Sequence, residues 1–385
     1  MGCFGFQHIL VADHASTGYA LCVGNLGQYF FAGSFMEDNK MFRTKFRHII
    51  GATMVAAIAF GSVGVAYSAD KVVWNFNVWG GQRAFTKGIE IIKEKLEAAG
   101  NGSFELKINY GDALGPKKQN PENIKVAAFE AGQICVGYYP GKYPLLSVME
   151  LPFLLPRDIN ARAKVEMAVL SHPDIVAELT DRWNSKFFGP AFLPAYEFMG
   201  NKRIETTDDM KGVKMRISGL NAMALQVFGA VPTMVTATEG YNALQRGTID
   251  SFGFPYTYAF GSYKLYEVSK YVTEGLAMSG FMCLQTVNID AWNKTPEAVR
   301  NALPAAQEAA IAGMIEAYAA ADKKWRPIFR DKLEVVTVDP KTRAKLAEGA
   351  GKIWAEWTKK HDAKGRPASK ILKFVQEQVS KAIGG

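Results

Sequence analysis

One arginine inside an apolar segment is the residue best suited to bind a ligand by charge. The segment DDMKGVKMRISG covers residues 208–219 and sets Arg216 between Met215 and Ile217 in a short alternating run. A planar guanidinium matches a carboxylate with two parallel hydrogen bonds, which lysine cannot do. Left without a partner in a desolvated cleft, it would cost roughly 3–5 kcal/mol. Arg216 is therefore expected to hold an anion, either a ligand carboxylate or an acid of the chain. The candidate acids are Asp208, Asp209 and Glu239.

Other residue types offer little chemistry. Beyond residue 69 only two histidines remain, His172 and His361, and neither has a cysteine or second histidine at metal-ligand spacing. We interpret both as surface residues. No Gly-x-Ser-x-Gly, P-loop or Gly-x-Gly-x-x-Gly motif follows a strand pattern. The sequence therefore predicts no catalytic residue, no metal and no cofactor, and the protein is not expected to be an enzyme.

The same region holds two cysteines, Cys135 and Cys283. They could form a disulfide in an oxidising compartment, but one pair so far apart is not a disulfide framework. We interpret them as buried small hydrophobic residues.

The first 69 residues have the composition of a targeting segment. Residues 41–69 combine a basic start, an apolar stretch from Ile49 to Ala66 and small residues before Asp70. This pattern predicts a cleaved signal peptide and a periplasmic location; the alternative is a single membrane anchor. Because Met41 would be a natural first residue, residues 1–40 are interpreted as a start-site error.

The composition is typical of a globular protein with a large hydrophobic core. The chain has 385 residues, of which 48% are hydrophobic and 21% charged, so it can form more than one domain. Its formal net charge of +8 is spread along the chain without a run of five like charges. Nucleic acid is therefore not an expected partner, whereas an anionic solute is compatible with the charge.

Alternating and helical patterns predict the elements that would position Arg216. Strands are expected at 71–78, 104–110 and 133–137, with helices between them, which is typical of a largely parallel sheet. A looser second series predicts strands at 187–198, 213–217 and 247–254, and helices dominate after residue 295. We expect lobe I mainly at 70–195, lobe II mainly at 196–290, and a helical hinge and closing segment at 291–385.

Several segments together resemble one known family. They are DDMKGVKMRISG (208–219), GAVPTMVTATEGYNALQRGTIDSF (229–252) and YKLYEVSKYV (263–272), with GDALGP (111–116) and MELPFLL (149–155) upstream. In order and spacing they are similar to the extracytoplasmic solute-binding subunits of TRAP transporters, the DctP-like family. The resemblance implies an α/β, two-lobed periplasmic-binding-protein-like fold with a ligand cleft between the lobes and long C-terminal helices.

The resemblance also implies a function. The family's proteins close on a solute, usually an organic acid, and deliver it to small and large membrane subunits. Arg216 stands at the position of the arginine that grips the ligand carboxylate.

Departures from the family pattern bear on the solute. Sialic-acid-binding members carry a second arginine where this chain has Tyr196, and an asparagine where it has Phe254. Members that bind 2-oxo acids with a metal have Glu-Trp where it has Gly253-Phe254. Further wall candidates are Trp79, Gln82, Tyr138, Tyr139 and Tyr256, and Lys142 and Arg203 could supply polar anchors. Aromatic neighbours favour a monocarboxylate with an apolar or aromatic body.

Rival functions share much of this pattern. A C4-dicarboxylate or another small organic acid could be bound by the same class of protein. An ABC-type or chemoreceptor-linked binding protein would also have two lobes and a secretion signal. A secreted enzyme acting on organic acids is the alternative from another class.

Overall fold

Two β-sheets form the centre of the protein in the computed structural model, which describes residues 71–217 and 219–384. The predicted signal peptide and start-site error therefore lie outside the described residues. The first sheet has the order β2 (Phe104–Asn109), β1 (Val72–Asn77), β3 (Ala131–Cys135), β10 (Cys283–Asn288) and β4 (Ser185–Pro190). The second has the order β11 (Glu334–Thr337), β9 (Tyr271–Glu274), β5 (Tyr196–Gly200), β8 (Ser251–Pro255), β6 (Lys214–Arg216) and β7 (Val231–Pro232).

The first sheet begins as the strand and helix series predicted from the sequence. β1 pairs in parallel with β2 and with β3, and α1 (Lys87–Gly100) and α2 (Asn120–Lys125) connect them. Hydrophobic residues of α1 recur at helical spacing, so Ile89, Ile92 and Leu96 are buried beneath the helix. The helix ends at Asn101, which adopts a left-handed conformation.

Within residues 71–217 and 219–384, the chain passes between the two sheets three times. Residues 191–195 lead from β4 to β5, residues 275–282 lead from β9 to β10, and α9 (Glu297–Lys332) leads towards β11. The single strand expected at 187–198 is therefore wrong, because it comprises β4 and β5 in different sheets. Pro190 and Pro194 bracket the break, and proline cannot donate to a strand ladder.

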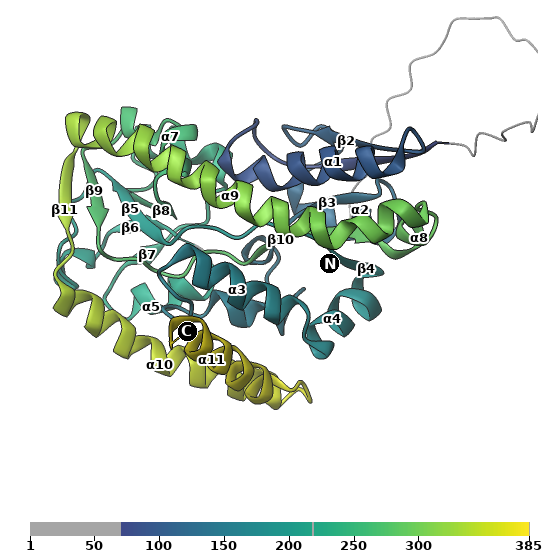
Figure 1. The fold of residues 1–385 in the computed structure, drawn as a ribbon. Helices are drawn as coiled ribbons and strands as arrows, with labels where there is room; N and C mark the ends of the chain where they lie inside the picture. The colour runs from purple at the N-terminus through teal and green to yellow at the C-terminus, as the bar shows by residue number, and fades with distance from the viewer. Residues whose placement is uncertain (1–70, 218, 385) are drawn as a thin grey trace, which may run out of the picture. The chain divides into compact units, whose positions relative to one another are not determined.

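Long helices follow β10 in the sequence (Figure 1). Helix α9 packs along α1 and also meets α7 (Tyr258–Ser262). α10 (Pro340–Asp362) packs on α11 (Ala368–Gly384) and on α5 (Leu220–Gln226), and α11 packs on α3 (Ile159–Leu170). The remaining α-helices are α4 (Pro173–Trp183), α6 (Gly240–Gln245) and α8 (Ile289–Asn293). Two sheets with long C-terminal helices confirm the predicted fold class.

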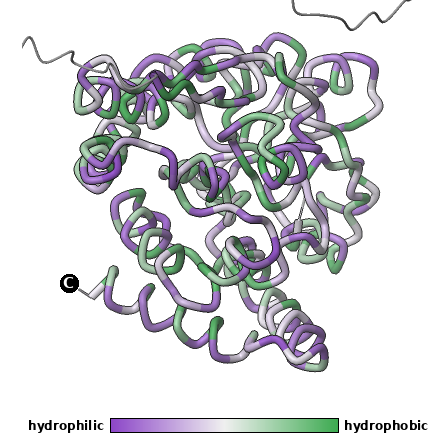
Figure 2. The backbone as a smooth tube through the Cα atoms, turned by 90° about the vertical axis from the view of Figure 1, so that its right-hand side faces the viewer, coloured by the Kyte–Doolittle hydropathy of each residue, from purple (hydrophilic) through white to green (hydrophobic). Residues whose placement is uncertain are grey.

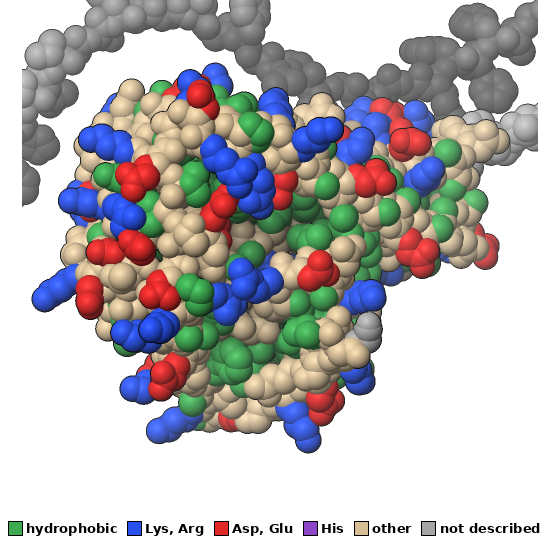
Figure 3. All heavy atoms as spheres, turned by 60° about the vertical axis from the view of Figure 1, so that its left-hand side comes forward, with side chains coloured by type: hydrophobic (Ala, Val, Ile, Leu, Met, Phe, Trp, Pro, Cys, Tyr) green, Lys and Arg blue, Asp and Glu red, His purple; other side chains and the backbone are tan. Residues whose placement is uncertain are grey.

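The outer helices carry a mixture of hydrophilic and hydrophobic residues, as the colours in Figure 2 show. On the face drawn in Figure 3, Lys/Arg and Asp/Glu side chains lie interspersed around patches of hydrophobic ones. Within the described residues, no helix has both the length and the apolar character needed to cross a bilayer.

Both histidines are buried, so the expectation that they lie on the surface is wrong. His172 precedes α4 and accepts a hydrogen bond from the Asp174 backbone N–H, with its ring 4.6 Å from that of Phe374. His361 lies one helical turn after Trp357, on the inner face of α10. Burial, helped by Arg366, lowers the pKa of His361 to about 4. Charged sequence neighbours concealed this helical periodicity.

Candidate functional site

Arg216 ends β6 and has no solvent exposure. Its Nε donates to the carbonyl oxygen of Val235 at 2.9 Å, and Nη1 donates to that of Gly253 at 3.1 Å. Nη2 lies 3.4 Å from the hydroxyl oxygen of Tyr138, which is a long hydrogen bond. The two carbonyls fix the plane of the guanidinium, and Nη2 has the weakest partner.

Aromatic rings surround the same guanidinium. Parallel pairing of β6 with β8 aligns Arg216 with Phe252, and Cζ lies 4.5 Å from the centre of that ring. The rings of Phe254 and Phe281 lie 5.3 and 5.5 Å away. Ring faces attract a cation, but they do not neutralise its charge.

The acids proposed as partners of Arg216 are engaged elsewhere or make no ion pair with it. Asp209 accepts hydrogen bonds from Glu205 and Thr206. Glu239 accepts from Thr236 at the start of a short helix. No carboxylate in the described part of the chain lies within the 4.0 Å ion-pair limit of Arg216. The alternative of an internal ion pair is therefore wrong.

A small cavity lies next to this arginine, and four of the predicted residues line it. Trp79 follows β1, Tyr138 follows β3, Tyr196 begins β5 and Phe254 lies in β8. Ends of strands from both sheets thus meet there, which is where ligand crevices form in α/β proteins. The space open to the centre of a water molecule is about 20 Å³, room for one or two waters. A ring-bearing acid would need the walls or the lobes to move apart.

Three predicted residues lie away from this cavity. The hydroxyl of Tyr139 donates to the Lys117 carbonyl at 2.6 Å. Gln82 is exposed and donates to Glu90 at 2.9 Å. Tyr256 donates to Glu274 at 2.6 Å, in another pocket. The suggested polar anchors are also remote from the cavity lining: Lys142 pairs with Glu122, and Arg203 pairs with Glu205 and Glu334.

Sequence reasoning missed several wall residues. Arg83 follows Trp79 by four positions in the same loop, so its position was a usable signal. Tyr263 begins one of the family-like segments. Phe281 gave no signal, because it comes from the crossing segment 275–282. The lining also includes Phe85, Cys135, Leu193, Ala237, Pro255 and Tyr258.

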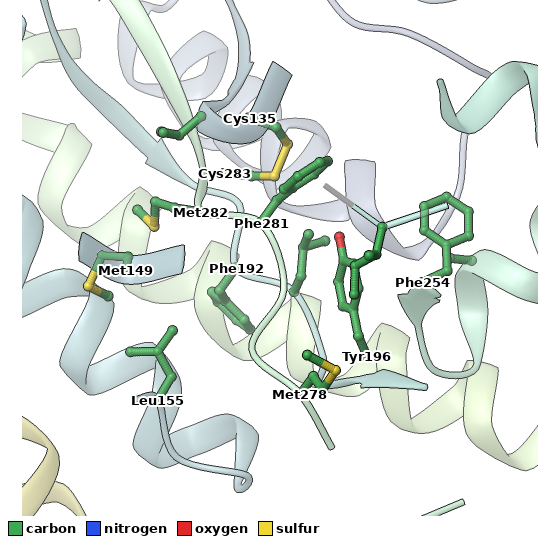
Figure 4. Close-up of a cluster of buried hydrophobic side chains, with 14 of the residues drawn as sticks. Cys135, Met149, Leu155, Phe192, Tyr196, Phe254, Met278, Phe281, Met282 and Cys283 are labelled. Atoms are coloured by element: carbon green, nitrogen blue, oxygen red, sulfur yellow. A yellow bond between two sulfur atoms is a disulfide. The ribbon is translucent and has the colours of Figure 1, made fainter. Parts of the chain in front are cut away.

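Phe281 occupies the centre of this wall. Figure 4 shows it beside the disulfide and close to Tyr196, with Phe254 beyond the tyrosine. The centre of its ring lies 5.1 Å from that of Tyr138 and 6.3 Å from that of Tyr196. Burial raises the pKa of Tyr196 well above its usual range, so this phenol remains a neutral wall group.

Cys135 and Cys283 form a disulfide. The two residues are buried, as predicted, but the interpretation as unpaired hydrophobic residues is wrong. Antiparallel pairing of β10 with β3 places Cys283 directly opposite Cys135. Sequence alone could not indicate this register, because two of the three crossings between the sheets lie between β3 and β10 along the chain.

A larger pocket of about 440 Å³ lies beside α10. Its lining includes Tyr139, Met223 and Trp357, with the carboxyl group of Glu150. Burial raises the pKa of Glu150 to about 8, against the effect of its hydrogen bond from the Met282 N–H. Tyr138, Phe254 and Phe281, which contact Arg216, line the small cavity and not this larger pocket. The small cavity is thus the better candidate for an anion.

No group of His, Cys, Asp and Glu suited to holding a metal ion occurs among residues 71–217 and 219–384.

Two α/β lobes, joined by repeated crossings and meeting at a buried arginine, define a solute-binding protein of the periplasmic type. The sequence profile described as "Bacterial extracellular solute-binding protein, family 7" (DctP) matches residues 77–361. The chain belongs to this family, which confirms the resemblance.

Curated relatives agree over part of their lengths. A "Solute-binding protein" of Verminephrobacter eiseniae is 28% identical over 191 residues, which are 48% of this chain and 55% of the relative. The "C4-dicarboxylate-binding periplasmic protein DctP" of Rhodobacter capsulatus is 26% identical over 265 residues, 67% of this chain and 77% of the relative. The chain thus spans little more than half of the first of these relatives.

Solved structures share the fold. A marine metagenome TRAP solute-binding protein specific for aromatic acid ligands, in complex with 3-hydroxybenzoate, superposes with a TM-score of 0.72 at 20% identity, covering 82% of this chain and 99% of the other. A TRAP periplasmic solute-binding protein of Desulfovibrio salexigens with bound orotic acid superposes with a TM-score of 0.72 at 22% identity. The match covers 81% of this chain and 100% of the other.

Proposed function

We propose that this protein is the extracytoplasmic solute-binding subunit of a TRAP transporter and captures an organic acid through a salt bridge between Arg216 and the ligand carboxylate. One observation carries the proposal: Arg216 is fully buried without a carboxylate partner among the described residues. A buried charge of this kind is stable only when an anion joins it or when the cleft opens to water.

The hydrogen bonds of Arg216 support a specific mode of capture. Val235 and Gly253 hold Nε and Nη1, so the group is already oriented before a ligand arrives. Nη2 has only the hydroxyl of Tyr138 at 3.4 Å. A carboxylate oxygen takes the place of that hydroxyl and forms a shorter, charge-assisted bond.

The walls support a monocarboxylate with an apolar or aromatic body. Trp79, Phe254 and Phe281 line the cavity with ring surfaces, and the last two lie next to Arg216. Among the relatives of the same fold, one is described with 3-hydroxybenzoate and another with orotic acid. A C4-dicarboxylate is the second candidate, favoured by the printed name of the Rhodobacter capsulatus relative.

The remaining parts of the proposal come from family membership. The acid is delivered to a small and a large membrane subunit, and the protein works in the periplasm after its signal peptide is removed. Lobe I remains mainly at 70–195 and lobe II mainly at 196–290, except that β10 belongs to the first sheet, and the closing helices lie in 291–385. A secreted enzyme is the rival function, and product formation from a bound acid would establish it.

Binding measurements on purified protein test the proposal. Isothermal titration calorimetry with benzoate, 3-hydroxybenzoate, phenylacetate and succinate should find binding of at least one ring-bearing acid. In Arg216→Lys we expect affinity to fall by about 30-fold or more, because a point charge replaces a bidentate fork. Arg246→Lys, an exposed arginine, serves as the matched control and should bind like the native protein. Unchanged affinity in Arg216→Lys would refute the salt bridge.

A further inference from the structure

The cavity lining itself contains a basic group. Arg83 lines the cavity and is partly exposed, and its Nη1 donates to the carbonyl oxygens of Trp79 and Gly81 at 2.9 and 2.7 Å. These bonds use the hydrogens of one nitrogen only, and a guanidinium has five N–H donors. No carboxylate of the described residues pairs with Arg83. Its remaining donors are therefore available to another acceptor.

The hydroxyl group of Tyr263 lies near Arg83, in the same lining. This oxygen is enclosed although the ring is half-buried, and it has no hydrogen-bond partner among the described residues. Burial raises the pKa of Tyr263, so the phenol keeps its proton. A buried hydroxyl without a partner costs free energy that an acceptor would recover.

Arg83 and Tyr263 converge on one point of the chain. A Cβ atom built on Gly80 would lie 3.1 Å from Nη1 of Arg83 and 3.1 Å from the hydroxyl oxygen of Tyr263. The guanidinium carbon of Arg83 also lies 5.8 Å from the centre of the Tyr263 ring. Arg83 lies between β1 of the first sheet and α1, whereas Tyr263 lies between β8 and β9 of the second sheet. The two residues therefore come from opposite sides of the cleft.

One ring separates this pair from Arg216. The centre of the Phe254 ring lies 5.4 Å from the centre of the Tyr263 ring. The guanidinium carbon of Arg216 lies 5.3 Å from the centre of the same Phe254 ring. Aromatic rings thus connect Arg216, which contacts the wall residues Phe254 and Phe281, to Arg83 in the cavity lining. This arrangement suits a ligand with polar groups at both ends and a ring in the middle.

We propose that Arg83 and the Tyr263 hydroxyl form a second polar subsite, which binds an oxygen acceptor at the end of the ligand opposite its carboxylate. The inference rests on the proposed function and narrows it. The solute is a ring-bearing monocarboxylate with a distal hydroxyl group, or a ring-bearing dicarboxylate, rather than a plain hydrocarbon acid. The same donors serve both chemistries, and the ligands used in the test separate them.

The test compares three acids that share a ring: benzoate, 3-hydroxybenzoate and benzene-1,3-dicarboxylate. We expect one or both of the two-ended acids to bind native protein about tenfold more tightly than benzoate, as one buried hydrogen bond allows. In Tyr263→Phe this advantage should disappear while the affinity for benzoate stays the same. Tyr266→Phe changes a phenol outside the cavity lining and should keep the advantage.

Arg83→Met provides a second variant and separates the two acceptors. Loss of the cation should weaken the dicarboxylate more than the hydroxy acid. The subsite is refuted if all three acids bind native protein equally, or if the advantage survives in both Tyr263→Phe and Arg83→Met. If none of the acids binds, the proposed function for ring-bearing acids fails and this inference fails with it.

Discussion

Nη2 of Arg216 lies 3.4 Å from the hydroxyl oxygen of Tyr138, and this contact joins the two sheets across the cleft. Tyr138 ends the turn after β3 of the first sheet, and Arg216 ends β6 of the second. The arginine that we propose as the ligand's partner thus contacts a neutral group of the opposite lobe. In the proposed mode of capture, the hydroxyl competes with the ligand carboxylate for the same donor.

Removal of this competitor should strengthen binding. In Tyr138→Phe the carboxylate no longer has to displace a hydroxyl, so we expect affinity for the acid identified by calorimetry to rise by about two- to fivefold, as a weak hydrogen bond implies. Tyr139→Phe is the matched control, because the Tyr139 hydroxyl bonds to Lys117 within lobe I. It should lower the unfolding temperature without changing affinity. A Tyr138→Phe protein that binds tenfold more weakly would instead make this hydroxyl a ligand contact.

Sequence reasoning identified Arg216 and the strand ends because both depend on local patterns. Local sequence patterns predicted strands at β1, β3 and β8, and residues at the ends of such strands meet at one edge of a sheet. Local patterns could not decide whether Tyr138 or Tyr139 lines the cavity. A single 3₁₀ turn directs Tyr138 towards the cavity and Tyr139 towards Lys117. The contribution of Phe281 depends on how the chain crosses between sheets, which no local pattern encodes.

Phe281 fits against a glycine, and that fit can be measured. A Cβ atom on Gly137 would lie 2.0 Å from the Phe281 ring, so Gly137→Ala should destabilise the fold by about 1–3 kcal/mol. Phe281→Ala should cost about 3–5 kcal/mol through lost packing. In the double variant the clash is absent, and the total loss should be at least about 1 kcal/mol less than the sum. Urea unfolding gives these values.

The control for this cycle is Gly81→Ala, where a Cβ atom would meet nothing within 4 Å. Its effect should simply add to that of Phe281→Ala. Simple additivity in the Gly137 pair as well would contradict the packing described here.

The disulfide should stabilise the junction of β3 and β10. It links residues 148 positions apart, so its loss frees a long loop in the unfolded chain. We expect the Cys135→Ala, Cys283→Ala double variant to lose about 2–4 kcal/mol of unfolding free energy. Native protein treated with dithiothreitol should approach the variant, whereas the variant itself should not respond to the reductant. Equal stability of oxidised native protein and variant would show that the bond contributes nothing.

Stability should fall as the pH rises towards 8, and Glu150 should cause part of the fall. Burial raises its pKa to about 8, so between roughly pH 4.5 and 8 the folded protein binds a proton that the unfolded chain releases. The stabilisation that comes from this proton is complete below about pH 4.5 and disappears above about pH 8. In Glu150→Gln, urea unfolding at pH 5 and pH 8.5 should differ less than in native protein, by roughly 2–4 kcal/mol. Glu356→Gln, an exposed acid of the same pocket, should keep the native profile. Identical profiles for Glu150→Gln and native protein would show that this carboxyl group titrates normally.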